Sequence, residues 1–293
     1  MTRFAVILIS PPGFPHAQAL ADVADAVAFG LEALGADVLR GGDPDVHGAR
    51  SIVLGAHLLD DPSALPSDAV IYNLEQLSAA SVWMTAAYRA ALRTHMVWDY
   101  SPRNLAVLTG LGAPAAHLMP VGHAPGLERV PQGPKDIDVL FYGAPHPRRQ
   151  AVLQALAARG VKVMAAVGVY GGARDALISR ARIVLNLHYY DPPQFEVVRV
   201  SYLLSNGVCV VSEGGDPEAE APFARAVAFA PYEAVVETCL ALLGDPPRRE
   251  QLAAAGQALM RARPQADFLR AALDPGEEAG VAALRTPWGW AKD

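Results

Sequence analysis

Apolar and polar positions along the chain follow two patterns, short unbroken apolar runs and longer stretches with helical spacing. Residues 4–9 form an apolar run that ends at a Pro- and Gly-rich loop, which predicts a strand buried on both faces. From about His16 to Leu34 the apolar residues recur at helical spacing, and Gly35 ends this helix before a second strand begins at Asp37. Strand, helix and strand within about 35 residues form one βαβ unit.

The same alternation continues, stops at a break, and then starts again. Further strands are predicted at 51–54, 69–72 and 96–98, and helices at 78–93 and 101–111. Pro and Gly residues are then dense between 114 and 134, which is typical of a linker. After this segment strands are predicted at 138–142, 161–166, 183–187 and 208–211, and helices at 148–159, 173–180, 195–204, 232–243 and 248–261.

This pattern predicts an α/β protein with two doubly wound, Rossmann-like domains that face each other across a cleft. We expect an N-terminal domain over 1–119, a linker over 120–134, a C-terminal domain over 135–273, and a tail over 274–293 that docks through aromatic side chains. Open parallel sheets bind ligands outside the carboxyl ends of their strands. The loops that follow the strands are therefore the first place to look for functional residues.

Composition narrows the class of protein. Of the 293 residues 52% are hydrophobic and 18% charged, which supplies two cores and excludes a disordered chain. A formal net charge of −6 argues against a broad surface for nucleic acid or anionic membrane. The only two cysteines lie in apolar runs, so we expect neither a disulfide framework nor a Cys-based zinc site. No run approaches the roughly 18 apolar residues of a membrane span, and we expect a cytoplasmic protein without a signal peptide.

The strongest candidate site lies within residues 186–213, where a buried strand ends in a polar loop and a helix begins near 194–198. The first N–H groups of a helix have no partners within the helix, so they suit a diphosphate. Arg199 can add a guanidinium group to a phosphate, and Glu196 can accept hydrogen bonds from sugar hydroxyls. In the structural alternative, Glu196 complements the helix dipole and Arg199 pairs with Glu196.

A second candidate loop follows the predicted strand at 138–142. Gly143 allows a ligand to approach the backbone closely. Arg148 and Arg149 lie at the start of a helix, where a cation is unfavourable unless an anion is bound. An ordinary turn with a solvated Arg pair is the alternative.

The helix–Gly–strand segment RVSYLLSNGVCVVSE at 199–213 resembles the donor-domain signature of nucleotide-sugar-dependent glycosyltransferases of the GT-B type, which have two Rossmann domains. The segment VLFYG at 139–143 with the following Arg pair resembles the start of that domain, and PVGH at 120–123 resembles the usual linker. The resemblance covers roughly residues 115–262. It implies a nucleotide diphosphate sugar as co-substrate with no other cofactor, bound by Gly143, Arg148, His188, Tyr189, Glu196, Arg199 and Glu213.

The chain departs from this family at one motif. Retaining members commonly carry two Glu residues eight positions apart, and the corresponding positions hold Gln194 and Tyr202. This puts a retaining mechanism in doubt and leaves Glu196 as a displaced substitute in nucleotide binding. The aromatic residues Tyr189 and Tyr190 stack on the donor, or alternatively only pack.

An inverting transfer needs a base with a pKa near neutral, and His16 is placed like the loop histidine of inverting GT-B enzymes. Asp99, at the end of a predicted strand, is the candidate that orients His16. The alternatives are a surface histidine and a carboxylate that only caps the next helix. Asn73 and Glu75 can recognise acceptor hydroxyls, or they are a turn residue and a helix-start acid.

The predicted function is transfer of a sugar from a nucleotide diphosphate sugar to a hydroxyl of a small molecule, glycan or protein. No Asp-x-Asp motif is present, which favours binding of the diphosphate without a metal ion. Two alternatives remain: an epimerase or hydrolase of the same fold, and a non-catalytic protein that binds nucleotide sugars. The loop around Gly13 does not form a G-x-G-x-x-G fingerprint, which argues against a dinucleotide dehydrogenase.

Overall fold

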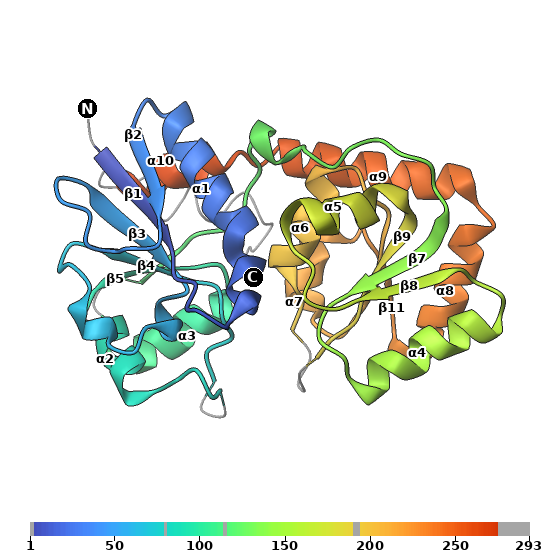
Figure 1. The fold of residues 1–293 in the computed structure, drawn as a ribbon, viewed down its shortest axis with the longest axis horizontal. Helices are drawn as coiled ribbons and strands as arrows, with labels where there is room; N and C mark the ends of the chain where they lie inside the picture. Colours follow the sequence, from blue (N-terminus) through green and yellow to red (C-terminus); the bar gives the residue numbers. More distant parts are fainter. Residues whose placement is uncertain (1–2, 79–80, 114–115, 190–193, 275–293) are drawn as a thin grey trace, which may run out of the picture. The chain divides into compact units, whose positions relative to one another are not determined.

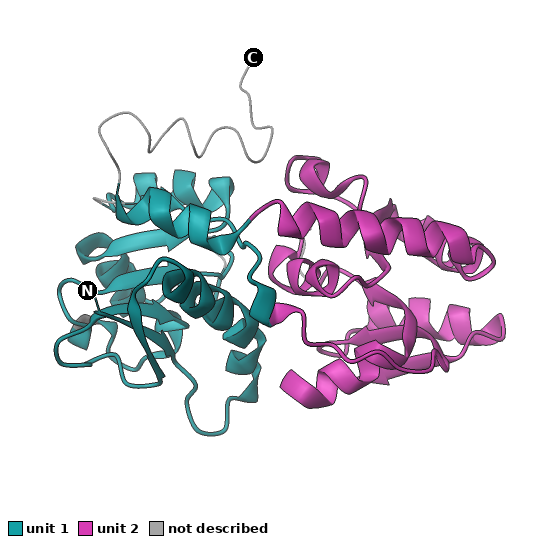
Figure 2. Cartoon of the chain, turned by 90° about the horizontal axis from the view of Figure 1, so that it is seen from above, with its two compact units in different colours: residues 1–126, 264–293 teal, residues 127–263 magenta. Residues whose placement is uncertain are grey.

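The computed structural model describes residues 3–78, 81–113, 116–189 and 194–274, which form two compact units. Unit 1 comprises residues 1–126 and 264–293, and unit 2 comprises residues 127–263 (Figure 2). Each unit is a parallel sheet with helices packed on it (Figure 1). The predicted α/β class with two doubly wound domains is therefore confirmed.

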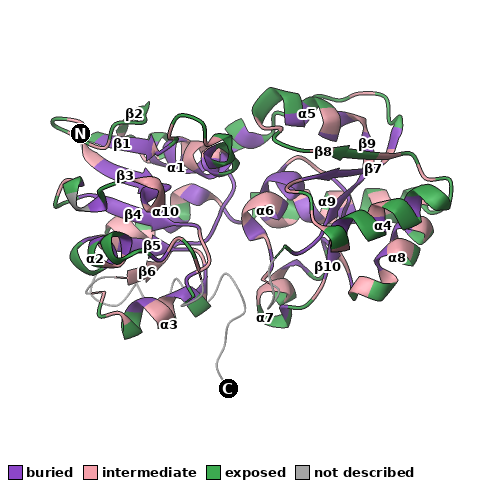
Figure 3. Cartoon of the chain, turned by 60° about the horizontal axis from the view of Figure 1, so that its bottom comes forward, coloured by how far each residue is buried: buried purple, intermediate pink, exposed green. Residues whose placement is uncertain are grey.

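Unit 1 contains a six-stranded sheet with the strand order β2-β1-β3-β4-β5-β6. All neighbouring strands are parallel, and they are β1 (Arg3–Leu8), β2 (Asp37–Gly41), β3 (Arg50–Leu54), β4 (Val70–Asn73), β5 (Met96–Asp99) and β6 (Ala116–Leu118). The connecting helices are α1 (Ala21–Ala33), α2 (Ala86–Thr94), α3 (Pro102–Gly110) and the short 3₁₀ helices η1 (Pro15–Leu20), η2 (Ala56–Leu58), η3 (Pro62–Ala64) and η4 (Pro125–Leu127). The central strands are buried on both faces, as their unbroken apolar runs require (Figure 3).

Unit 2 contains a five-stranded parallel sheet with the strand order β11-β10-β9-β7-β8. Its strands are β7 (Ile137–Tyr142), β8 (Val163–Ala166), β9 (Ala181–Asn186), β10 (Val210–Glu213) and β11 (Ala228–Ala230). Its helices are α4 (Pro147–Ala158), α5 (Gly171–Arg180), α6 (Val197–Ser205), α7 (Pro217–Glu220), α8 (Val235–Leu243), α9 (Pro246–Arg261), η5 (Ala221–Phe223) and η6 (Tyr232–Ala234). The core lies between β7, β9 and β10 and the helices α4, α8 and α9.

The final described helix, α10 (Gln265–Leu273), corrects the predicted domain boundary. Residues 264–273 were predicted to belong to the C-terminal domain, with no helix expected there, but α10 belongs to unit 1 and packs on α1 (Figure 1). Leu269 is fully buried there, and a Cβ atom added to Gly30 of α1 would lie 2.7 Å from its Cδ1. The absence of a side chain at Gly30 therefore creates the contact, which sequence periodicity alone does not reveal.

Other boundaries also differ from the predictions. The chain passes from unit 1 to unit 2 after Gly126, inside the predicted linker. Helix α2 begins at Ala86 rather than at 78, because the Thr85 hydroxyl accepts a hydrogen bond from the Tyr88 N–H and caps the helix there. The short elements β6, α7 and β11 were not predicted. The tail beyond residue 274, with its predicted docking role, lies outside the described residues.

Within the described part of the chain, no helix combines the length and the apolar character that crossing a bilayer needs.

Candidate active site

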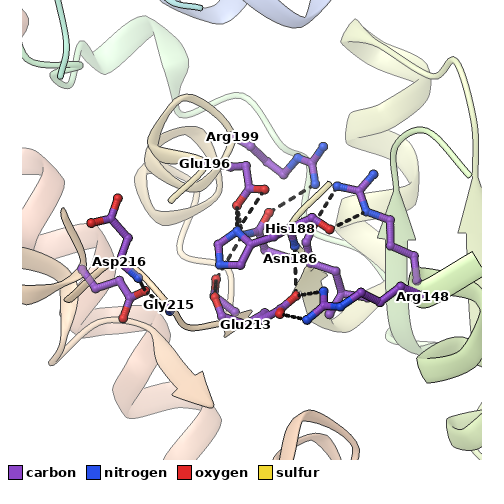
Figure 4. A network of polar contacts seen from close by, with 12 residues as sticks. Arg148, Asn186, His188, Glu196, Arg199, Glu213, Gly215 and Asp216 are labelled. Carbon is purple, nitrogen blue, oxygen red and sulfur yellow. Dashed lines mark hydrogen bonds and ion pairs between the residues drawn. The ribbon is translucent and has the colours of Figure 1, made fainter. Parts of the chain in front are cut away.

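A network of charged and polar side chains lies at one edge of the unit 2 sheet (Figure 4). The strands β7, β9 and β10 are parallel neighbours in this sheet, so their carboxyl ends lie side by side. Residues of the network follow each of these strands, with Gly143 after β7, His188 after β9 and Glu213 at the end of β10. Helix α6 adds Arg199 from its first turn, and Glu196 lies directly before that helix.

Glu213 and Arg148 form the first ion pair of the network. The Arg148 guanidinium contacts both oxygens of Glu213, and its Nη1 lies 2.7 Å from Oε2. The Glu213 side chain is only 5% exposed, and it also accepts a hydrogen bond from the backbone N–H of His188 at 3.1 Å. The guanidinium lies 3.8 Å from the centre of the Tyr232 ring. The buried charge of Glu213 is thus compensated by Arg148.

His188 and Glu196 form the second ion pair. The Nδ1 atom of His188 lies 3.1 Å from Oε2 of Glu196, and that oxygen also accepts a hydrogen bond from the Asn186 amide at 2.7 Å. Burial lowers the pKa of His188, but the bond to Glu196 and the charges of Glu196, Glu213 and Glu220 raise it above the ordinary value. Burial raises the pKa of Glu196, but His188, Arg199 and Asn186 hold it below the ordinary value. Both shifts favour an imidazolium–carboxylate pair.

The second ring nitrogen of His188 has no such partner. Its Nε2 atom is buried and makes no hydrogen bond with the described residues. Buried polar atoms are nearly always hydrogen-bonded, so an isolated one marks a place where a ligand can bind. In the charged state of His188 this atom is a hydrogen-bond donor.

Two further guanidinium groups flank Gly143. A Cβ atom added to Gly143 would lie 3.2 Å from Nη2 of Arg199 and 3.6 Å from Nη1 of Arg149, and the φ angle of this residue is +150°. Arg149 donates hydrogen bonds to the carbonyl oxygens of Ala144, Leu187 and His188. Arg199 donates to the amide oxygen of Asn186 at 3.2 Å. The hydrogen bonds of both groups thus go to neutral oxygens, and their charges are not cancelled as that of Arg148 is.

The two charges repel each other across Gly143. Burial, with the charge of Arg199 as a further cause, lowers the pKa of Arg149 to about 10. An anion bound beside Gly143 would relieve this repulsion. The geometry therefore favours a ligand with negative charge, and a diphosphate fits this requirement.

The loop after β10 holds a carboxylate on two backbone N–H groups. Oε1 of Glu220 accepts hydrogen bonds from the N–H groups of Gly215 and Asp216 at 2.7 and 2.6 Å. Paired N–H groups of this kind bind oxyanions, and here a side chain of the same unit occupies them.

The structure brings together most of the predicted donor residues, namely Gly143, Arg148, His188, Glu196, Arg199 and Glu213 (Figure 4). Their assigned roles remain predictions. Tyr189 lies beside them, 42% exposed, with its ring 5.0 Å from the Arg149 guanidinium. Tyr190 lies outside the described residues. Glu196 bonds to Asn186 and His188, which differs from the predicted alternative of an Arg199–Glu196 pair.

Sequence reasoning missed Asn186, which links Glu196, Ser212 and Arg199 by side-chain hydrogen bonds. A polar residue at the end of an apolar strand run was the available signal. Because Asn186 is fully buried and contacts residues far along the chain, its role appears only in three dimensions.

The residues of the predicted catalytic pair, His16 and Asp99, both lie in unit 1. His16 is exposed at the start of η1, with its ring 5.6 Å from that of Phe14. The carboxylate of Asp99 is fully buried and accepts hydrogen bonds from the side chains of Asn73 and Asn104 and from the Ser101 N–H. The role of Asp99 as the residue that orients His16 stays a prediction. The base role of His16 stays a prediction.

Among the residues that the structure describes, no group of three or more His, Cys, Asp or Glu side chains is arranged to hold a metal ion. The prediction of metal-independent binding is not tested by this.

Residues 127–268 match the family described as "Glycosyl transferase-like". This segment coincides closely with unit 2. Unit 2 is therefore similar to the domains of this family.

Two related sequences come from Acanthamoeba polyphaga mimivirus. The uncharacterized protein L138 is 31% identical over 107 residues, which is 35% of this chain and 12% of the viral protein. The uncharacterized protein L140 is 31% identical over 116 residues, 38% of each chain. The matches thus span well under two thirds of either relative.

Solved glycosyltransferases share the fold of the whole chain. AviGT4, a glycosyltransferase involved in avilamycin A biosynthesis, aligns over 96% of this chain and 99% of its own with a TM-score of 0.55 and 17% identity. HepE from Anabaena, solved in complex with UDP, aligns over 93% of this chain and 99% of its own, with a TM-score of 0.58 and 13% identity. This chain therefore has the predicted GT-B fold.

Proposed function

We propose that this protein is a glycosyltransferase that transfers a sugar from a nucleoside diphosphate sugar to an acceptor hydroxyl, and that unit 2 binds the donor. The arrangement around Gly143 carries the proposal. Two guanidinium groups, those of Arg149 and Arg199, lie against a residue without a side chain, and their hydrogen bonds to the described residues go to neutral oxygens. A donor diphosphate supplies the missing negative charge at a point where the backbone leaves room for it.

The same residues suit the chemistry of the leaving group. When the bond between the anomeric carbon and the diphosphate oxygen breaks, negative charge develops on the nucleoside diphosphate. Arg199 and the Nε2–H of a protonated His188 can then stabilise that charge. Among the described residues Arg199 donates to a neutral amide oxygen, and Nε2 of His188 makes no hydrogen bond. Since protein groups supply this positive charge, we propose that the reaction needs no metal ion, and EDTA should leave turnover unchanged.

The UDP in the HepE complex makes uridine donors the first ones to test. A ligand that binds only the folded protein raises the melting temperature by mass action. We therefore expect one of UDP, GDP, ADP and dTDP, with its sugars, to raise the melting temperature of the full chain more than the others. The acceptor can be a small molecule, a glycan or a protein.

Arg199→Ala tests the site itself. Loss of a charge-assisted contact of about 1.5–3 kcal/mol weakens binding of the nucleoside diphosphate about 10- to 100-fold. Arg159→Ala is the matched control, because Arg159 is 54% exposed and pairs only with the exposed Glu237 on the surface of unit 2. Equal binding by both variants would contradict the proposal.

The product of turnover separates the predicted alternatives. Transfer to an added alcohol supports a glycosyltransferase, whereas release of free sugar alone indicates a hydrolase and a change in the sugar of the donor indicates an epimerase. Binding without turnover at any acceptor indicates a non-catalytic protein.

A further inference from the structure

Asn186 lies between two groups of opposite charge at the end of β9. Its amide nitrogen donates a hydrogen bond to Oε2 of Glu196 at 2.7 Å, and its amide oxygen accepts one from Nη1 of Arg199 at 3.2 Å (Figure 4). The Asn186 side chain is fully buried. Because a carboxylate can only accept hydrogen bonds and a guanidinium group can only donate them, the two partners fix which end of the amide faces each of them.

The neighbouring strand holds the amide in this orientation. Ser212 of β10 pairs with Asn186 in the parallel register, and its hydroxyl accepts a second hydrogen bond from the amide nitrogen at 3.0 Å. The same hydroxyl donates its proton to the carbonyl oxygen of Glu213 at 2.9 Å, so it acts as an acceptor toward Asn186. Ser212 is fully buried as well. The amide therefore cannot turn over without losing hydrogen bonds at buried atoms.

Glu196 and Arg199 would otherwise be suited to pair with each other. They lie three positions apart at the start of α6, a spacing at which side chains on a helix meet and acids commonly pair with bases. In the structure the hydrogen bonds of the Glu196 carboxylate to described residues go instead to Asn186 and His188, and that of the Arg199 guanidinium goes to Asn186. The amide thus takes the place that each charge would have in an ion pair.

The two terminal nitrogens of Arg199 face different groups. Nη1 donates to the amide oxygen of Asn186, and Nη2 lies 3.2 Å from the position of a Cβ atom added to Gly143. The guanidinium carbon also lies 5.0 Å from the centre of the Tyr142 ring. Because a guanidinium group is planar and rigid, holding Nη1 also sets the direction of Nη2. Nη2 thus faces the point where the donor diphosphate is proposed to bind.

The same amide leaves the charge of Glu196 to act on His188. Nδ1 of His188 lies 3.1 Å from Oε2 of Glu196. Burial lowers the pKa of His188, but Glu196, together with Glu213 of β10 and Glu220 of α7, raises it above its ordinary value. Arg149 of α4 donates a hydrogen bond to the carbonyl oxygen of His188 at 3.3 Å. The imidazolium form, in which Nε2 is a hydrogen-bond donor, is therefore favoured.

We propose that Asn186 is a positioning residue of the donor site, whose amide keeps Arg199 and Glu196 from pairing so that Arg199 faces the diphosphate and Glu196 faces His188. This inference rests on the proposed function, because the donor diphosphate is the ligand that the arrangement serves. A carboxamide suits the position because it offers a donor and an acceptor without a charge. An aspartate would pair with Arg199 and repel Glu196, and a leucine would leave those two side chains to pair with each other.

Asn186→Leu and Asn186→Asp in the full chain test this role by nucleotide binding. In both variants a carboxylate neutralises Arg199, that of Glu196 in the first and the introduced one in the second. The probe is UDP, or whichever of GDP, ADP and dTDP raises the wild-type melting temperature more. We expect its Kd to rise about 10-fold or more in titration calorimetry.

The matched controls are Asn206→Leu and Asn206→Asp. Asn206 is an amide of the same unit that also bonds through both ends of its side chain, but its partners are backbone groups of residues 127–130 and 202. These controls should bind the same nucleotide with a Kd within about twofold of the wild-type value.

The His188 ring distinguishes a positioning role from a purely structural one. In Asn186→Leu, pairing with Arg199 cancels the charge of Glu196, so the pKa of His188 should fall below its wild-type value. In Asn186→Asp a negative charge is added to the network, so the pKa of His188 should rise. NMR titration of the ring measures both shifts. A loss of packing alone gives no reason for shifts in opposite directions.

Glu196→Gln provides a rescue experiment. In a chain that carries both Asn186→Leu and Glu196→Gln, the carboxylate that would pair with Arg199 is gone. We therefore expect its Kd for the same nucleotide to return to within about threefold of the value for Glu196→Gln alone. If Asn186→Leu does not fold, Asn186→Asp keeps the size of the side chain and still tests the affinity and the direction of the His188 shift.

Three results would overturn the inference. They are wild-type affinity in either folded Asn186 variant, a His188 pKa that moves against the stated direction, and no recovery of affinity in the double variant. The proposed function fails separately. If none of the four nucleoside diphosphates binds the wild type, the donor proposal is wrong, and the His188 titrations still test whether Asn186 keeps the two charges apart. If the nucleotide binds but the Asn186 variants behave as the Asn206 controls do, only the role of Asn186 is wrong.

Discussion

The two units place chemically different clusters at the same edge of the same type of sheet. In unit 2 the acids have cationic partners, so Glu196 has a lowered pKa and His188 a raised one. In unit 1 the acids face amides and aromatic rings, so burial raises the pKa of both Glu75 and Asp99 to about 7. The fold fixes where polar residues gather, and the neighbouring side chains decide whether the pKa values of the acids are lowered or raised.

Removal of a buried acid should be more damaging in unit 1 than in unit 2. Asp99→Ala removes one of the acceptors of each of two amide groups and the acceptor of the Ser101 N–H, all at a fully buried position. We expect a loss of about 3 kcal/mol in the free energy of unfolding, measured by urea denaturation.

Glu213→Ala is the corresponding change in unit 2. The loss should be only about 1 kcal/mol, because Arg148 is 38% exposed and can turn to water. Equal losses in the two variants would remove the contrast between the units.

Gly143→Ala should weaken donor binding by unit 2. The added methyl group lies 3.2 Å from Nη2 of Arg199 and forces a residue with a side chain to adopt a φ of +150°. We expect about 30-fold weaker binding of the nucleoside diphosphate, equivalent to about 2 kcal/mol, by titration calorimetry.

Gly133→Ala is the matched control, because the nearest atom to its Cβ would be 3.4 Å away and this glycine has no left-handed φ. If Gly143→Ala bound the nucleotide as this control does, the guanidinium groups beside Gly143 would not be the diphosphate site.

The pH dependence of stability distinguishes the two clusters. Because the pKa of folded Glu75 is raised from 4.5 to about 7, the folded state holds a proton that the unfolded state has released, and stability falls as pH rises through this window. His57, with its pKa lowered from 6.5 to about 4, acts in the opposite direction. Glu75→Gln removes the first effect only. We expect this variant to gain about 2 kcal/mol relative to the wild type between about pH 4.5 and 7.

The measurement is a series of urea denaturations at several pH values. If the free energy of unfolding of Glu75→Gln shows no gain over that of the wild type across this window, the pKa of Glu75 is not raised. The same series with Glu32→Gln gives the baseline for removal of an exposed acid.

In unit 2 the corresponding substitution should lower stability rather than raise it. Glu196→Gln removes the bond and charge that raise the pKa of His188, so that pKa should fall. The measurement is an NMR titration of the His188 ring. The His188 contribution to stability is present below pH 6.5 and is lost as pH rises through its folded pKa, and the variant should lose it earlier. An unchanged titration would contradict the pairing.

Much of this arrangement can be predicted from the sequence, because buried parallel strands are unbroken apolar runs and polar residues after them lie at one sheet edge. This logic finds Gly143, Arg148, His188, Glu196 and Arg199. It does not give the pairing of Arg148 with Glu213, which are 65 positions apart. Only the fold determines which acids and bases meet.

The missed features have the same physical origin. The hydrogen bonds that Asp99 accepts from the amides of Asn73 and Asn104 join residues far apart in the chain, so the sequence does not reveal them. Of the two interpretations of Glu75, a residue that recognises hydroxyls and a helix-start acid, the second is wrong within the described chain, because no helix begins there before Ala86. Helix α10 joins unit 1 because Gly30 leaves room for Leu269, a fit that composition does not reveal.

A crystal structure of the full chain with the nucleoside diphosphate that raises its melting temperature most tests the central claim most directly. The account predicts diphosphate oxygens within about 3 Å of the Arg199 guanidinium, next to Gly143, with a further contact at Nε2 of His188. Nucleotide bound elsewhere in the protein, with Arg199 still donating only to Asn186, would contradict it.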